Sequence, residues 1–61
     1  MERFIVTVEG HGWSDFEEIE LPGLPQIGEP VDTQYGTLPV VETSAAPDGS
    51  PYAGKIVCRL P

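Results

Sequence analysis

The fold is decided by the stretch RFIVTVE, residues 3–9, in which apolar side chains alternate along a run rich in β-branched residues. Successive side chains of a strand point to opposite faces, so Phe4, Val6 and Val8 share one face and begin a core. Ile5 lies on the other face, which we therefore expect to be partly covered as well.

A second strand is predicted over Trp13–Leu21, after a turn at Gly10-His11-Gly12. Ile19 has the parity of the core face of this strand, whereas Phe16 does not. A bulge near Glu17-Glu18 would bring Phe16 onto the core side, and we expect one there.

A short helix over residues 14–20 is the alternative. Ser14 and Glu17 have the spacing of a capping box, in which each side chain hydrogen-bonds to the backbone of the other residue. Pro22 would limit such a helix to about two turns. The strand is the preferred interpretation.

Proline and glycine, seven of each, divide the rest of the chain into short segments. Residues 21–28 predict a loop in which Leu24 and Ile27 plug one end of the core. Residues 29–33 predict a short edge strand, because Pro30 has no amide proton to donate to a second neighbour.

The C-terminal part of the chain predicts a hairpin in which residues 37–43 pair with residues 54–60. The connection contains Pro47-Asp48-Gly49, where proline presets φ and glycine accepts a positive φ. The core-facing residues of the two strands are expected to be Leu38, Val40, Ile56, Cys58 and Leu60.

These segments predict an all-β protein with a single domain over residues 1–61. We expect a small four- to five-stranded antiparallel barrel or curled sheet with at most one short helical turn. The segment Gly28-Glu29-Pro30-Val31 and the hairpin after it resemble small SH3-like β-barrels over residues 20–60. The paired aromatic pattern of signalling SH3 domains is missing, so we do not carry over their peptide binding. The small acidic chain also looks like accessory proteins of bacteria and their phages.

The charge of the chain limits its partners. Ten acidic residues stand against three basic ones, which gives a formal net charge of −7. Affinity for nucleic-acid phosphates and anionic membranes comes from Lys and Arg, so we expect neither as a direct partner. A basic protein surface fits the charge better. No apolar run approaches the roughly 20 residues of a membrane helix, and no signal peptide is recognisable, so we expect a cytoplasmic location.

Catalysis, metals and cofactors are not expected. The chain has one cysteine, Cys58, and one histidine, His11, which allow no intrachain disulfide and fall short of a zinc site. Cys58 is predicted to lie in the core and His11 in an exposed turn. No phosphate-binding glycine loop, dinucleotide fingerprint or nucleophile elbow is present, so we predict a protein that is not an enzyme.

The candidate partner-binding residues are acidic and aromatic: Trp13, Asp15, Glu17, Glu18, Glu20, Tyr35 and Tyr52. The four acids form either a solvated strand face or a contact for a basic partner, and a calcium or catalytic site is the least supported interpretation. Trp13 either covers the core or anchors an interface. The two tyrosines either pack over their turns or join Trp13 in an exposed patch.

The function predicted from these residues is a non-catalytic interaction module that binds a basic protein surface or a second copy of itself. One alternative is a nucleic-acid mimic, in which carboxylates imitate phosphates and inhibit a DNA- or RNA-binding protein. Another is a structural or accessory subunit that assembles through open strand edges, expected around Pro30 and residues 55–60.

Overall fold

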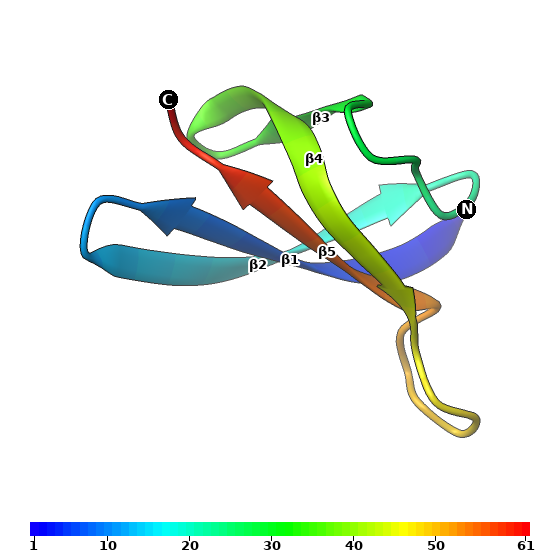
Figure 1. The fold of residues 1–61 in the computed structure, drawn as a ribbon. Helices are drawn as coiled ribbons and strands as arrows, with labels where there is room; N and C mark the ends of the chain where they lie inside the picture. The colour runs from blue at the N-terminus through cyan, green and yellow to red at the C-terminus, as the bar shows by residue number, and fades with distance from the viewer.

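The computed structural model describes all 61 residues and contains five β-strands and no helix (Figure 1). The strands are β1 (Glu2–Gly10), β2 (Trp13–Leu21), β3 (Pro30–Thr33), β4 (Gly36–Ala45) and β5 (Gly54–Arg59). The predicted all-β class and the curled sheet are confirmed. The chain contains no helix that is long and apolar enough to cross a lipid bilayer.

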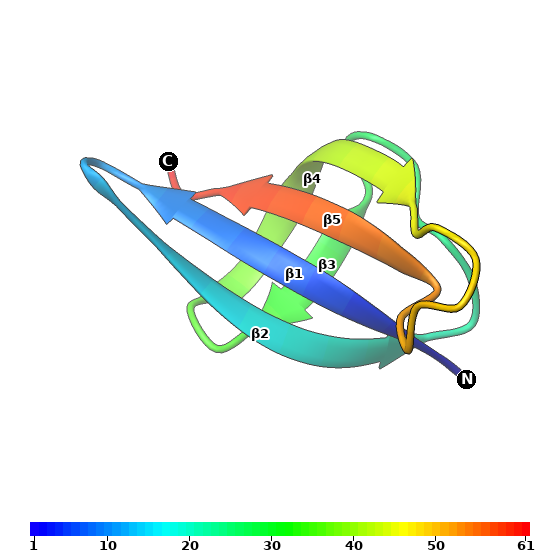
Figure 2. The same cartoon turned by 90° about the horizontal axis from the view of Figure 1, so that it is seen from below.

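The strands form one sheet in the order β2-β1-β5-β4-β3, so the first and last strands lie side by side at its centre (Figure 2). The expected antiparallel pairing holds for β1/β2, β3/β4 and β4/β5. The pair β1/β5 is parallel, with Phe4 beside Gly54 and Glu9 beside Arg59. A parallel pair needs a long crossover, and here the whole segment between the two strands serves as that connection.

The core lies on the concave face of the sheet, and β1 supplies its centre. Phe4, Val6 and Val8 are at most 1% exposed, and Val6 lies beside Ile56 of β5. Leu60 is half-buried against this cluster. The eight buried core residues are Phe4, Val6, Val8, Val31, Leu38, Val40, Ile56 and Cys58. The core faces predicted for β1, β4 and β5 are therefore confirmed, including the position of Cys58.

The sheet curls because β4 bends sharply along its length (Figure 1). A shift of register between Val40 and Glu42 marks a bulge, which increases the local twist of a strand. The β3–β4 hairpin therefore folds back across the concave face of the other three strands (Figures 1 and 2). The result is a half-barrel whose two edge strands are β2 and β3.

The second run of the chain, β2, is a strand over its whole length, so the alternative of a helix over residues 14–20 is wrong. Its register with β1 is uninterrupted along all nine residues, so the expected bulge near Glu17-Glu18 is wrong as well. Unbroken alternation places Phe16 on the convex face, where it is 62% exposed.

The loop between β2 and β3 covers one end of the core with a residue other than those expected. Ile27 is 70% exposed and Leu24 is 46% exposed, whereas Pro25 is buried. Leu24 still reaches Gly54, since a Cβ added to that glycine would lie 2.9 Å from Leu24 Cδ1. The prediction of a plug is thus wrong for Ile27 and holds only in part for Leu24.

The free edges of the sheet differ in one case from those expected. The edge position of β3 is confirmed, since this strand begins at Pro30 and pairs only with β4. The hairpin of residues 37–43 with residues 54–60 is confirmed as β4/β5. The open edge expected at residues 55–60 is wrong, because β1 pairs with that side of β5. The second free edge is β2.

Candidate interaction surface

The acidic cluster of β2 is divided between the two faces of the sheet. Asp15 and Glu17 lie on the concave face, since their neighbours in β1 are core residues. Glu18 and Glu20 lie on the convex face together with Phe16. One cluster in the sequence therefore becomes two pairs in the structure, and each pair meets different neighbours.

The concave pair joins β2 to the turn between β3 and β4. The Asp15 carboxylate accepts hydrogen bonds from the Tyr35 hydroxyl at 2.5 Å and from Gln34 Nε2 at 3.4 Å. It also accepts one from the backbone N–H of Phe16 at 2.8 Å. The Glu17 carboxylate accepts from the backbone N–H of Gln34 at 3.1 and 3.3 Å. These charge-assisted bonds close the half-barrel where no strand ladder does.

Aromatic packing reinforces the same closure. The ring centroids of Trp13 and Tyr35 are 5.2 Å apart with their planes tilted by 50°, a favourable geometry for an aromatic pair. Trp13 also lies against Gly10, where an added Cβ would be 2.3 Å from the indole Cε2. Trp13 is 43% exposed and Tyr35 is 40% exposed. The two rings are therefore only partly buried, and their packing holds together two segments of the same chain.

The contact between Asp15 and Tyr35 shifts the pKa of both groups. The hydrogen bonds from Tyr35 and from the Phe16 backbone lower the pKa of the Asp15 carboxyl below its ordinary 3.8. The same hydrogen bond to Asp15, together with burial and the charges of Asp15 and Glu17, raises the pKa of Tyr35 above 10.0. The closure is strongest where Asp15 is ionised and Tyr35 is protonated.

On the convex face, Glu18 is held by Tyr52 and Arg3. The Tyr52 hydroxyl donates to Glu18 Oε1 at 2.7 Å, and Arg3 Nε lies 3.8 Å from Glu18 Oε2. The hydrogen bond to Glu18 raises the pKa of Tyr52 above its ordinary value. The half-buried Tyr52 thereby ties the loop before β5 to β2. It does not join the other two aromatic residues, so the three do not form a common patch.

The side chains of Phe16 and Glu20 are both exposed on the convex face. Glu20 is exposed and takes part in no side-chain hydrogen bond or ion pair. Phe16 lies beside Thr7 of β1, and Val57 of β5 lies on the other side of Thr7. The Thr7 hydroxyl is buried and has no hydrogen-bond partner. A mainly apolar strip, Phe16–Thr7–Val57, thus crosses the convex face.

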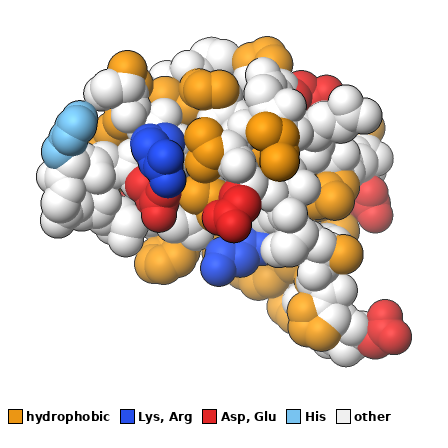
Figure 3. Space-filling view, viewed as in Figure 1, with side chains coloured by type: hydrophobic (Ala, Val, Ile, Leu, Met, Phe, Trp, Pro, Cys, Tyr) orange, Lys and Arg blue, Asp and Glu red, His pale blue; other side chains and the backbone are white.

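The basic residues of the chain are all on the convex face. Arg59 pairs with Glu9 at 3.1 Å, Arg3 pairs with Glu18, and Lys55 forms no ion pair. Figure 3 shows basic and acidic side chains next to one another on one side of the molecule. Asp15 and Glu17 lie on the concave face, and no basic residue accompanies them there.

The outer edge of β2 is open. The strand pairs with β1 alone, and alternate residues of an antiparallel strand direct their N–H and C=O groups to opposite sides. The N–H of Phe16 points away from β1, since it donates to the Asp15 side chain. The backbone groups of Glu18 and Glu20 face the same outer side, where no other segment bonds to them. Such an edge is a template for a further strand.

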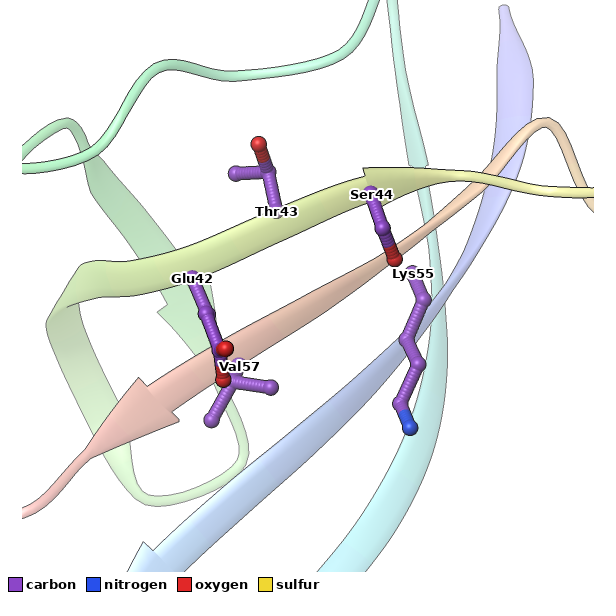
Figure 4. Close-up of a pocket in the computed structure, with 5 residues that line it drawn as sticks. All are labelled: Glu42, Thr43, Ser44, Lys55 and Val57. Atoms are coloured by element: carbon purple, nitrogen blue, oxygen red, sulfur yellow. The ribbon is translucent and has the colours of Figure 1, made fainter.

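A shallow hollow of about 140 Å³ lies beside the bulge of β4 (Figure 4). It is lined by Glu42, Thr43, Ser44, Lys55 and Val57. The side chain of Thr43 extends to one side of β4, and the side chains of Glu42 and Ser44 extend to the other side, where Lys55 and Val57 of β5 also lie (Figure 4). None of the five lining residues carries a buried, unpaired polar atom, so the hollow does not define a ligand.

Sequence reasoning missed Gln34 and Phe16 as parts of this surface. Gln34 meets Glu17 through its backbone N–H, so no side-chain pattern signals that contact. Phe16 did carry a signal, since its parity differs from that of Ile19, and strict alternation puts the two on opposite faces. A bulge near Glu17-Glu18 would reverse this alternation, so assuming one leads to the opposite prediction for Phe16.

No protein-family model, no curated protein and no solved structure matches this chain. The candidate surface is therefore defined by its own geometry.

Proposed function

We propose that this chain is a non-catalytic interaction module that binds a basic, extended segment of a partner protein along the free edge of β2. The observation that carries the proposal is a nine-residue edge strand with no backbone partner on its outer side. In strand addition, main-chain hydrogen bonds supply affinity, and the side chains on alternate positions supply specificity.

The charge of the chain favours a basic partner. The net charge is −7, and Glu20 on this edge makes no ion pair. Charge complementarity accelerates association and disfavours partners of the same sign. Two copies of this chain joined edge to edge through β2 would place two sets of four carboxylates on adjoining strands, which is unfavourable.

Phe16 provides the apolar anchor beside these acids. It is 62% exposed and continues the strip formed with Thr7 and Val57. Aromatic side chains are enriched among the residues that dominate binding energy. Burying the rest of Phe16 under a partner contributes about 1–2 kcal/mol.

The two other predicted functions have less support from the arrangement of the acids and edges. A nucleic-acid mimic needs a row of free carboxylates, whereas Asp15, Glu17 and Glu18 all accept hydrogen bonds from within the chain. Assembly as a structural subunit lacks the open edge expected at residues 55–60, since β5 is paired on both sides, and retains only the short four-residue edge of β3 at Pro30.

The test is a titration of isotope-labelled protein with a peptide of alternating lysine and threonine, followed by amide chemical shifts at low and high salt. We expect the shift changes to concentrate in β2 and to weaken as salt screens the charges. A glutamate–threonine peptide of equal length is the charge control and should cause no change. Changes spread evenly over all acidic segments would contradict the proposal.

A matched pair of variants sharpens this test. Glu20→Gln removes one charge from the proposed edge, and Glu29→Gln removes one charge from an exposed acid outside β2. The first variant should bind the basic peptide more weakly, and the second should bind it nearly as well as the parent. An equal loss in both would mean that net charge alone attracts the peptide.

A further inference from the structure

We infer that the partner segment runs antiparallel to β2 and carries the pattern basic–x–basic–x–apolar. Its three specified side chains lie opposite Glu20, Glu18 and Phe16, in that order. This inference rests on the proposed function and adds the direction, the register and the side-chain classes of the partner. Glu20, Glu18 and Phe16 occupy every second position of β2 and share its convex face.

The two halves of the β2 edge differ in how open they are. In the N-terminal half, Asp15 already accepts the outward N–H of Phe16, and the turn carrying Gln34 and Tyr35 sits against Asp15. In the C-terminal half, the outward backbone groups of Glu18 and Glu20 have no partner. A bound strand therefore makes its main-chain bonds at these two residues and ends near Phe16.

The side-chain classes of the partner follow from what this half of the edge displays. Residues directly opposite one another on neighbouring strands bring their Cβ atoms to about 4.5–5.5 Å, which is within reach of an ion pair or an apolar contact. Lysine or arginine fits opposite Glu20 and Glu18, and an apolar residue fits opposite Phe16. Because antiparallel pairing is the more stable arrangement, the partner meets Glu20 first.

The two acidic positions are not equivalent. Glu18 is shared with Tyr52 and Arg3. Arg3 lies beside Glu20 in the register of the sheet, but its guanidinium pairs with Glu18, which leaves the Glu20 carboxylate free. The basic residue of the partner that lies opposite Glu20 should therefore matter more than the one opposite Glu18.

The experiment compares three capped peptides of one composition. The first is Lys-Thr-Lys-Thr-Phe, the second is its reverse, Phe-Thr-Lys-Thr-Lys, and the third, Lys-Lys-Thr-Thr-Phe, breaks the alternation. We expect the first to bind about three- to tenfold more tightly than the other two, since these misplace at least one cross-strand pair. Affinities come from the shift titration of the β2 amides.

A spin label reads the direction of the bound peptide. Placed on the C-terminal end of the first peptide, it should broaden the amide signals near Ser14. Placed on the N-terminal end, it should broaden those near Leu21. The opposite assignment would show a parallel partner and overturn the inference.

Substitutions in the protein test the register. Glu20→Gln should weaken binding of the first peptide more than Glu18→Gln does. Phe16→Ser should remove the preference for the peptide that ends in phenylalanine over one that ends in serine. Ile27→Ser, which changes an exposed apolar residue outside β2, is the matched control and should keep that preference.

The outcomes separate this inference from the proposed function. If all three peptides bind equally and still perturb β2, the function stands and the pattern is wrong. If no peptide perturbs β2, both are wrong. If the free protein self-associates through β2, the occupant is a second copy, and the inference of a basic partner is overturned.

Discussion

Asp15 accepts hydrogen bonds from donors on two segments of the chain, namely Tyr35, Gln34 and the backbone of Phe16. Its pKa is lowered in the folded state, so its contribution to the closure is fully present above 3.8 and is lost as pH falls through the lower folded value. The pKa of Tyr35 is raised, so its contribution is present below 10.0 and is lost as pH rises through the higher folded value.

The fluorescence of Trp13, which packs on Tyr35, should report the loss of this contact on acidification. We expect a spectral change with a midpoint below pH 3.8, because the folded carboxyl holds its charge to lower pH. Tyr35→Phe removes the main hydrogen bond and should move the midpoint upward toward 3.8. An identical midpoint in the two proteins would show that Asp15 does not control the packing of Trp13 on Tyr35.

The side-chain hydroxyl of Thr7 is buried and has no hydrogen-bond partner. Leaving a buried donor unpaired is costly, so Thr7→Val, which keeps the β-branched shape, should raise the free energy of unfolding by about 1 kcal/mol. Urea denaturation measures this. The control is Thr37→Val, where the lost hydroxyl donates to Asp32 at 2.6 Å and no gain is expected. A less stable Thr7→Val protein would indicate that the hydroxyl is hydrogen-bonded in solution.

At the scale of elements, β2 is an edge strand whose two faces make different contacts. Its concave residues Trp13, Asp15 and Glu17 hold the β3–β4 turn. Its convex residues include the exposed Phe16 and Glu20. Charged side chains on an edge also discourage pairing between identical copies. The same alternation thus directs the residues that close the half-barrel to one face and leaves Phe16 and Glu20 exposed on the other.

The hairpin between β1 and β2 depends on a glycine next to the turn. A Cβ at Gly10 would lie 2.3 Å from the Trp13 indole, so Gly10→Ala should displace the ring and weaken its packing on Tyr35. Near-ultraviolet circular dichroism should show a reduced aromatic signal. Gly23→Ala is the control, since an added Cβ there meets nothing within 4 Å. A full signal in Gly10→Ala would mean that the indole can move aside without losing its contact.

At the scale of the whole molecule, a core of eight residues supports a chain of net charge −7. A chain of this size buries only about 60% of the surface that it exposes when unfolded, so small electrostatic terms matter. The two ion pairs are both on the exposed convex face, and exposed pairs contribute little. We therefore expect repulsion among the acids to be the dominant electrostatic effect on stability.

Added sodium chloride should raise the thermal unfolding midpoint, because it screens this repulsion more than it weakens the two ion pairs. The double variant Glu29→Gln/Asp48→Asn removes two acids that form no ion pair and should show a smaller salt effect. Thermal melts at several salt concentrations measure both. A midpoint that falls with salt would show that the ion pairs outweigh the repulsion.

The sequence by itself determined the strands and most of the core. Alternation along residues 3–9 placed Phe4, Val6 and Val8 inside, and Pro30 marked an edge. These features are local, because strand faces follow from a period of two and turns follow from the backbone preferences of proline and glycine. The same alternation, applied without a bulge, also predicts that Phe16 is exposed.

Only the tertiary structure decided the parallel pairing of β1 with β5 and the roles of the acids. Both depend on how segments far apart in the sequence meet when the sheet curls. That curl turns Asp15 and Glu17 toward the β3–β4 turn and leaves Glu20 facing solvent. The role of a carboxylate is set by the donors within about 3 Å of it, and no local pattern in the sequence specifies those donors.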